Sequence, residues 1–487
     1  MQVEDTQPVL EDPARAATNA WPATAIAALA VALAVGALYL LQLQPRLYGD
    51  GPGLVSMVAL GGSTYHVAFL PLARAFASTL AGGDAVLAGQ LACALPMAAA
   101  AGLLVPTFQR LGVSLRAASL GALVWATTPG ALFFATTVEV HAPHAAAFAL
   151  TLFAVTHAPW SRPVLATLLV VPALAALYWT HVSAPLLGLG LVLLVKVSAP
   201  RLSWPAVLFG VGPAWLLAFV LAMSLAAAWR GLGFSPFAVD KELSILSDYA
   251  RTDDVVGVFW HNLVPYLVAA ILGVGGLVCG IPARARLAWV ALVVPSWIFF
   301  TVWGVREFGG YFLPTTTLLA WGVASLRVLS VDRVRTFVVG AAVVSLQLVL
   351  GRLEIERWGE GWDYTDRAAI AHQALPDGGT LVVPWVDAPS VELWHDDVVE
   401  FPIMQQISRG MLGGLPPESM AVAAQGLAQL LAEGPVAVDL SYRTRAEFHA
   451  VGGRLPFFEA LEAALDDQYR VERHERGVFA VVRIELP

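Results

Sequence analysis

Long apolar runs separated by short polar segments dominate the first 350 residues of this 487-residue chain. A helix that spans a lipid bilayer needs roughly 20 mostly apolar residues, and by this measure the chain has about eleven spans. The predicted spanning helices cover residues 22–43, 85–108, 117–134, 142–157, 163–178, 183–197, 204–228, 256–280, 288–303, 311–326 and 337–350. The pattern predicts an α-helical polytopic membrane domain over residues 22–351, preceded by a short tail over 1–21.

The last part of the chain, residues 352–487, has a different pattern. Short alternating or continuous apolar runs predict strands, and one stretch has helical periodicity. The predicted strands cover 380–385 and 436–440, the helix covers 456–467, and a terminal hairpin covers 469–473 and 478–484. We therefore expect a C-terminal α/β soluble domain.

Composition supports the membrane class. Hydrophobic residues make up 58% of the chain, charged residues only 13%, and the mean hydropathy is +0.69, whereas an ordinary soluble domain has about 25% charged residues. The two cysteines give no disulfide framework. No basic patch indicates nucleic-acid binding. Acids rather than bases precede the first apolar run, so we expect a retained anchor helix and not a cleaved signal peptide.

Basic residues in short loops predict the orientation of the membrane domain. They place the N-terminus in the cytoplasm and the acidic C-terminal domain outside. This arrangement requires that residues 65–80 do not cross the bilayer. That segment is short and contains Pro71 and Arg74, which is typical of a helix lying on the outer surface.

Asp50 is the first candidate for chemistry. It lies in the turn Tyr48-Gly49-Asp50-Gly51, just after the first predicted span. A carboxylate near a membrane surface is costly unless it faces water, a partner or a substrate. The glycines permit tight backbone geometry, so Asp50 could serve as a general base; the alternative is an aspartate that only stabilises a turn.

The second candidate group is Glu139, His141 and His144, at the outer end of the third and fourth spans. In an extended segment Glu139 and His141 share a face, and Pro143 favours the first turn of the following helix. These side chains could bind a substrate or a divalent cation. The alternative is a polar helix end with local hydrogen bonds.

The third candidate pair is Arg306 and Tyr311, in an outer loop before a late span. A planar guanidinium fits a phosphate, and a tyrosine hydroxyl can donate a hydrogen bond to one. The alternative for Arg306 is a contact with Glu307 or a lipid headgroup. A weaker candidate segment is Tyr178-Trp179-Thr180-His181, in which the aromatics indicate an interfacial belt and His181 a hydrogen-bonded helix-end residue.

These three segments resemble GT-C glycosyltransferases, which are polytopic enzymes that use polyprenyl-phosphate-linked sugars and include protein O-mannosyltransferases and aminoarabinose transferases. Tyr48-Gly49-Asp50-Gly51 is similar to the first-loop motif of the family, and Glu139-Val140-His141-Ala142 to a Glu-Val-Tyr-Ala motif. Arg306 with Tyr311-Phe312-Leu313-Pro314 resembles a late Arg-Tyr-Phe-Leu-Pro motif. The similarity extends over the membrane part of the chain.

The resemblance implies an inverting glycosyltransferase that moves a hexose or pentose from a polyprenyl-phosphate donor to an acceptor hydroxyl outside the membrane. It implies that Asp50 is the catalytic base, and that Glu139, His141, Arg306, Tyr311 and His66 bind substrate. The partners it implies are the donor, membrane lipids and an acceptor protein, glycan or lipid, and the location it implies is a bacterial inner or plasma membrane. Many relatives have a second acid where Gly51 stands, and often His-Pro-Pro where His66-Val67-Ala68 stands. Metal dependence and acceptor class therefore stay open.

A polytopic transporter or lipid-linked-sugar flippase is the alternative. That class would place ionisable residues at mid-membrane and show related halves. The sequence has few charges inside its predicted spans and no evident repeat. Its polar candidates gather at one predicted face, which favours an enzyme.

Overall fold

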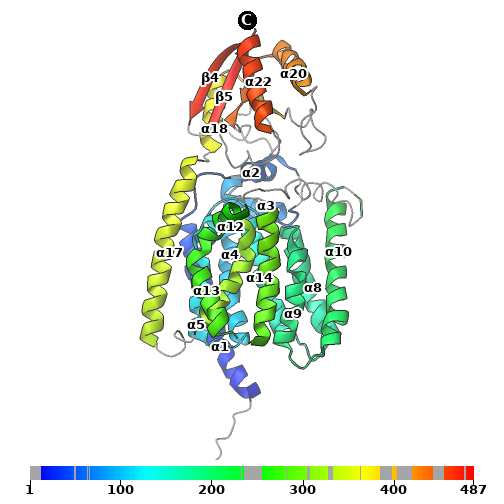
Figure 1. The fold of residues 1–487 in the computed structure, drawn as a ribbon, viewed down its shortest axis with the longest axis vertical. Coiled ribbons are helices and arrows are strands. Elements are labelled where there is room, and N and C mark those ends of the chain that lie inside the picture. The colour runs from blue at the N-terminus through cyan, green and yellow to red at the C-terminus, as the bar shows by residue number, and fades with distance from the viewer. Residues whose placement is uncertain are drawn as a thin grey trace, which may run out of the picture.

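A computed structural model describes the chain over residues 13–48, 51–62, 64, 66–231, 233–234, 255–281, 283–303, 308–326, 329, 333–361, 364–383, 397–402, 419–441, 454–476 and 479–486. A helical bundle occupies one part of the molecule and a small domain with a sheet lies beyond one end of it (Figure 1). The expected fold class, a polytopic helical membrane protein with a C-terminal α/β domain, is confirmed.

Each predicted span has a helical counterpart. The first half of the bundle contains α1 (Pro13–Leu40), α2 (Gly51–Leu60), α3 (Phe69–Thr79), α4 (Ala85–Arg110), α5 (Leu115–Ala126), α6 (Pro129–Thr136), α7 (His141–His157) and α8 (Pro163–Thr180). The second half contains η1 (Ala184–Leu187), α9 (Gly188–Ser198), η2 (Ala206–Val211), α10 (Gly212–Trp229), α12 (Val255–Leu263), η3 (Val264–Tyr266), α13 (Leu267–Cys279), α14 (Ala283–Trp303), η4 (Gly310–Phe312), α15 (Leu313–Ala324) and α17 (Arg333–Gly361).

Fewer helices than expected are long enough to cross a bilayer by themselves. In the described residues, seven helices pass by length and composition, and α5 with α6 makes an eighth if the pair is one span. That pair is bent by 65°, because Pro129 begins α6 and the Thr128 hydroxyl accepts from the amide of Ala131. The other predicted spans are shorter, such as α7 with 17 residues and α15 with 12.

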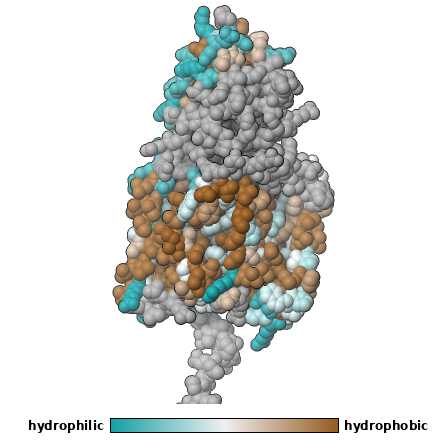
Figure 2. Space-filling model, viewed as in Figure 1, coloured by the Kyte–Doolittle hydropathy of each residue, from teal (hydrophilic) through white to brown (hydrophobic). Residues whose placement is uncertain are grey.

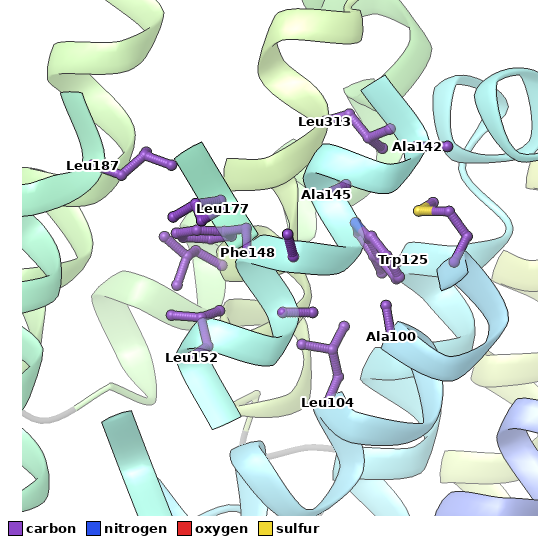
Figure 3. Packing of buried hydrophobic residues seen from close by; sticks show 14 of the residues in the cluster. Ala100, Leu104, Trp125, Ala142, Ala145, Phe148, Leu152, Leu177, Leu187 and Leu313 are labelled. Carbon is purple, nitrogen blue, oxygen red and sulfur yellow. The ribbon is translucent and has the colours of Figure 1, made fainter. Parts of the chain in front are cut away.

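Burial separates the centre of the bundle from its periphery. Of the residues in the apolar stretch of α4, 78% are buried inside the protein, whereas only 22% are buried in the corresponding stretches of α1 and α17. The side chains that fill the centre come from several helices, and Trp125 and Phe148 lie among alanine and leucine side chains there (Figure 3). On the face that Figure 2 shows, a hydrophobic band covers the helical part, while hydrophilic residues lie on the sheet domain and along the lower rim. This band has the character of a lipid-facing surface.

Glycines allow two helices of the bundle to approach very closely. A β-carbon on Gly276 of α13 would lie 1.7 Å from the carbonyl oxygen of Gly322 on α15. A β-carbon on Gly322 would in turn lie 2.2 Å from the carbonyl oxygen of Gly273. Small residues at such contacts increase van der Waals packing between membrane helices, so this pair fixes α13 against α15.

Two short helices, α2 and α3, lie at the end of the bundle next to the sheet domain (Figure 1). Arg74 of α3 donates to the carbonyl oxygens of Met57 (2.7 Å) and Gly62 (3.1 Å), which belong to the last turn of α2 and the loop after it. The guanidinium therefore holds the two helices together. The location of α3 at the membrane surface stays a prediction.

The C-terminal domain has a five-stranded mixed sheet in the order β2-β1-β3-β5-β4. β1 pairs in parallel with β2 and β3, whereas β5 is antiparallel to β3 and β4. The strands are β1 (Gly379–Val383), β2 (Val398–Pro402), β3 (Val436–Asp439), β4 (Arg470–Arg476) and β5 (Phe479–Glu485). The predicted strands correspond to β1, β3, β4 and β5, and β2 was not predicted.

Helices cover both faces of this sheet. α20 (Ser419–Glu433) and α22 (Arg454–Gln468) pack on one face, and α18 (Tyr364–Ala374) packs on the other. α17 has 29 residues and is therefore about 43 Å long, which exceeds the roughly 30 Å apolar core of a bilayer. It extends toward the sheet domain, where α18 follows (Figure 1).

Candidate functional site

Four buried histidines meet where α7 begins and α8 ends. The ring of His181 lies at the centre of the group, with ring centroids 5.0 Å from His66, 5.7 Å from His141 and 4.8 Å from His144. All four side chains are at least 96% buried. Residues from three separate segments thus form one cluster, which we call the histidine cluster.

Hydrogen bonds determine the tautomers of two of these rings. The Nδ1 of His66 lies 3.0 Å from the carbonyl oxygen of Thr180, which can only accept, so Nδ1 carries the hydrogen. The Nδ1 of His144 lies 3.2 Å from the hydroxyl of Thr180, and that hydroxyl already donates to Leu177. The His144 Nδ1 therefore donates as well, and neither ring needs a second proton.

His181 has the opposite tautomer. The backbone amide of Ser183 donates to His181 Nδ1 at 3.1 Å, so the hydrogen of this ring is on Nε2. Burial and the neighbouring imidazoles lower the pKa of His181 well below its ordinary value. Burial, with a smaller effect of nearby His141, lowers the pKa of His66 to about 3. These two rings are accordingly neutral at physiological pH.

Tyr311 connects the histidine cluster to the late part of the bundle. Its ring stands edge-on to His141 at 4.7 Å and to His181 at 5.4 Å, and stacks on Phe300 at 4.4 Å. Tyr311 is only partly buried. The predicted substrate residues His66, His141 and Tyr311 are therefore in one place, and His144 lies with them.

The segment before Tyr311 has a left-handed backbone. Phe308 has φ 47° and Gly309 has φ 77°. A bulky residue with positive φ is a genuine outlier that costs roughly 1–2 kcal/mol. The aromatic ring of Phe308 is 3% exposed and packs edge-on against Phe133 at 5.0 Å.

Phe133 also contacts the first loop. Its ring lies 5.4 Å from the ring of Tyr48, so Phe133 stands between Tyr48 and Phe308. Next to this contact, a β-carbon on Gly51 would lie 2.8 Å from the carbonyl oxygen of Val138. The described residues on both sides of position 50 therefore contact the segment that leads to Glu139.

Glu139 is 7% exposed. Its Oε2 accepts from the amide of Val140 at 2.9 Å, and its backbone carbonyl accepts from the thiol of Cys93 at 3.1 Å. The segment is not extended through His141, because α7 begins at this residue; Pro143 lies in the first turn of the helix, as the sequence predicted. A proline is tolerated there because the first amides of a helix have no intrahelical partner.

The structure provides no metal-binding set in the part of the chain that it describes. Within those ranges, no group of three or more His, Cys, Asp or Glu side chains could hold a metal ion. The Nδ1 atom of His144 is directed to Thr180. Metal binding by Glu139, His141 and His144 stays a prediction.

Two predicted site residues, Asp50 and Arg306, lie outside the described residues. Sequence reasoning also missed some members of the site. It treated His181 as a helix-end residue, which its contact with Ser183 agrees with, but not as the centre of a cluster. The contribution of Phe133 was missed too, because the contacts of a buried side chain depend on helix packing that the sequence does not display.

The chain was compared with known proteins. No protein-family profile matches it, and no curated protein matches it in sequence. Solved structures do match. The crystal structure of ArnT from Cupriavidus metallidurans bound to undecaprenyl phosphate is 15% identical with a TM-score of 0.59, and the match covers 94% of this chain and 97% of that one.

The same protein in the apo state is also 15% identical with a TM-score of 0.59, over 96% of this chain and 98% of ArnT. The chain has the GT-C fold. The expectation from the three sequence motifs is thus confirmed at the level of the fold. The GT-C likeness extends over nearly the whole of both chains, including the C-terminal domain. At 15% identity it establishes the fold and not the reaction.

Proposed function

We propose that this chain is a membrane glycosyltransferase that moves a sugar from a polyprenyl-phosphate donor to an acceptor hydroxyl. Asp50 is the general base, and Arg306 with Tyr311 binds the donor phosphate. Glu139, His141 and His66 orient the substrates, and the reaction inverts the anomeric centre. The site lies at the end of the bundle that faces the C-terminal domain, which is the non-cytoplasmic side.

One observation carries this proposal: the described neighbours of all three sequence motifs meet. Phe133 packs against both Tyr48 and Phe308. Those residues lie two positions before Asp50 and two positions after Arg306. Because consecutive Cα atoms are about 3.8 Å apart, these short separations in sequence support the proposal that Asp50 and Arg306 act in one region.

The third motif lies in the same region. Gly51, which follows Asp50, lies against Val138, which precedes Glu139. His141 contacts Tyr311 directly. The described neighbours of the proposed base, phosphate-binding pair and substrate-orienting groups thus lie close together, which favours a transferase over a path through both faces of the membrane.

The reaction that these groups support is a single displacement. The Asp50 carboxylate takes the proton of the acceptor hydroxyl as that oxygen bonds to the anomeric carbon. The bond from this carbon to the phosphate oxygen breaks, and its electron pair leaves with the polyprenyl phosphate. The sugar is transferred with inversion because attack and departure occur on opposite faces.

The leaving group explains why a cation and a donor suffice at the phosphate. A phosphate monoester has a second pKa near 6, so it departs without protonation at neutral pH. Its growing negative charge requires stabilisation by hydrogen-bond donors or positive charge. The guanidinium of Arg306 and the hydroxyl of Tyr311 are suited to this role.

The ArnT structure supports the class of donor, because that protein is bound to undecaprenyl phosphate in its crystal. A polyprenyl chain cannot leave the bilayer, so a site at the rim of a helical bundle suits such a donor.

The test is Asp50→Asn in the purified full-length protein, assayed with a panel of polyprenyl-phosphate sugars for release of polyprenyl phosphate. The proposal expects a loss of at least about a hundredfold in kcat, the lower end of a general base's contribution. Asp84→Asn is the matched control. Asp84 is an exposed cap that accepts from the amides of Val86 and Leu87, and asparagine caps equally well. If the Asp50→Asn variant kept full transfer activity, Asp50 would not be the general base.

A further inference from the structure

We infer that Asn262 and Tyr266 are positioning residues that clamp the left-handed turn at Phe308–Gly310 and thereby place the phosphate-binding side of the site. The inference rests on the proposed function for its catalytic consequence. The existence of the clamp is inferred only from the backbone conformation of the turn and its contacts.

The turn needs external support because its backbone is unfavourable. Phe308 has φ 47° and is followed by Gly309 at φ 77°. Left-handed residues in succession are rare, and a bulky aromatic in this region is strained. Such a conformation persists only where the surrounding structure determines it.

Both polar backbone groups of Gly309 are held. Its amide donates to the side-chain Oδ1 of Asn262 at 3.1 Å. Its carbonyl oxygen accepts from the hydroxyl of Tyr266 at 3.0 Å, in addition to the backbone amides of Phe312 and Leu313. Asn262 and Tyr266 have exposed fractions of 0%. They lie four positions apart across the junction of α12 and η3, so one structural unit provides both contacts.

Steric contacts close the clamp from two sides. A β-carbon on Gly309 would lie 2.4 Å from the carbonyl oxygen of Asn262 and 2.5 Å from the ring of Tyr266. A β-carbon on Gly310 would lie 2.4 Å from the ring of His141. The Gly309-Gly310 pair is therefore pressed between the α12–η3 junction and the start of α7, with no space for a side chain.

The clamp connects two contacts that the proposed function needs. On one side of the pair, Phe308 packs against Phe133. On the other, Tyr311 packs against His141 and the histidine cluster. If the turn relaxed, both aromatic anchors would shift, and the phosphate-binding segment would shift with them. Asn262 and Tyr266 act through the turn, not on the substrate.

The first experiment measures hydrogen exchange in the peptide that covers residues 308–313 of the full-length protein in detergent. Tyr266→Phe removes only the hydroxyl that donates to Gly309, and Asn262→Ala removes the acceptor for its amide. Each is expected to accelerate exchange in this peptide about tenfold. Asn262→Asp retains an acceptor oxygen and is expected to restore protection.

Tyr39→Phe is the matched control. Tyr39 is also fully buried and its hydroxyl also donates to a backbone carbonyl, that of Ala126 at 2.8 Å. The same atom is deleted, but away from the turn, so exchange at residues 308–313 should not change. Unchanged exchange in Tyr266→Phe and Asn262→Ala would overturn the clamp, whatever the activity. Equal acceleration in Tyr39→Phe would also overturn it, because the effect would then be general.

The second experiment measures binding of undecaprenyl phosphate by the same variants. The inference expects Tyr266→Phe to weaken this binding and raise the KM for the donor about fivefold, with a smaller change in kcat, and Asn262→Asp to bind better than Asn262→Ala. Faster exchange with unchanged lipid binding would overturn the link between the turn and the phosphate. If the wild type neither binds undecaprenyl phosphate nor transfers sugar, the proposed function fails, while the exchange experiment still decides the clamp.

Discussion

The β-carbon position of Gly51 lies 2.8 Å from the carbonyl oxygen of Val138. Real β-carbons essentially never come this close to another heavy atom, so position 51 accepts only glycine unless one of the segments moves. The first loop and the segment before Glu139 can thus pack closely because Gly51 has no side chain. This contact fixes the relation between two of the three sequence motifs.

Gly51→Ala should therefore strongly lower the kcat/KM for sugar transfer while changing the melting temperature little. The added methyl pushes the start of α2 from Val138, and displacements of about 1 Å in a site can cost about a hundredfold in rate. The measurement is kcat/KM together with the melting temperature in detergent. Gly426→Ala is the control, because nothing lies within 4 Å of its β-carbon position. Wild-type kcat/KM in Gly51→Ala would show that this contact does not place the loop.

Gly276→Ala should destabilise the membrane domain. Its β-carbon would lie 1.7 Å from the carbonyl oxygen of Gly322, so α13 and α15 must separate. Overpacking of this kind typically costs about 1–3 kcal/mol, and a lower melting temperature should report it. Gly275→Ala is the matched control on the same helix, since its nearest neighbour atom is 3.8 Å away in a leucine side chain. Equal melting temperatures for the two variants would contradict the close contact.

Acid should destabilise the protein through His66. Burial lowers its pKa in the folded state to about 3 from the ordinary 6.5, so the unfolded chain binds the extra proton first. The stabilisation is complete above pH 6.5 and is lost as pH falls toward about 3, at up to about 1.4 kcal/mol per pH unit. His181 acts in the same direction. Melting temperatures at pH 7.5 and pH 5 measure the effect.

His66→Asn tests the source of this pH dependence. An asparagine amide can still donate toward Thr180, but it does not titrate. The variant should lose less stability between pH 7.5 and pH 5 than the wild type does. An identical loss would place the titrating group elsewhere.

The sheet domain should depend on one buried ion cluster. Arg367 of α18 contacts Asp439 of β3 at 2.6 Å and Glu400 of β2 at 3.0 Å, and all three side chains are at most 6% exposed. Arg367→Ala would leave two buried carboxylates without this cation, which typically costs about 3–5 kcal/mol. Limited proteolysis of the C-terminal domain should then accelerate strongly.

A surface arginine provides the contrast. Arg473 pairs with Glu462 and Asp466 but is 34% exposed, and exposed pairs contribute about 0–1 kcal/mol. Arg473→Ala should leave proteolysis nearly unchanged. If both variants behave alike, burial does not decide the importance of these ion pairs.

The sequence predicted those parts of the fold that depend on local pattern. The terminal hairpin was expected, and its register places Arg476 opposite Phe479. β2 and α18 were missed, because their short apolar patterns are explained only by packing within the sheet domain. The bend between α5 and α6 was also missed, although Thr128 before Pro129 is a recognisable helix start.

For the candidate site too, features that depend on the local sequence were predicted and contacts between distant helices were not. The grouping of His66, His141 and Tyr311 was predicted from loop order and resemblance. The central place of His181 was not, because it depends on how the ends of α7 and α8 are rotated. The clamp by Asn262 was equally invisible, since a buried asparagine has no distinctive spacing. Local chemistry could be predicted, whereas contacts between distant helices could not.

The central claim is that the first loop, the Glu139 segment and the Tyr311 segment enclose one phosphate site at the end of the bundle next to the sheet domain. An experimental structure of the full-length protein with undecaprenyl phosphate tests it most directly. The account predicts phosphate density within hydrogen-bond reach of Arg306 and Tyr311, with the Asp50 carboxylate facing the same cavity. Phosphate bound elsewhere, or Asp50 and Arg306 at opposite ends of the bundle, would contradict it.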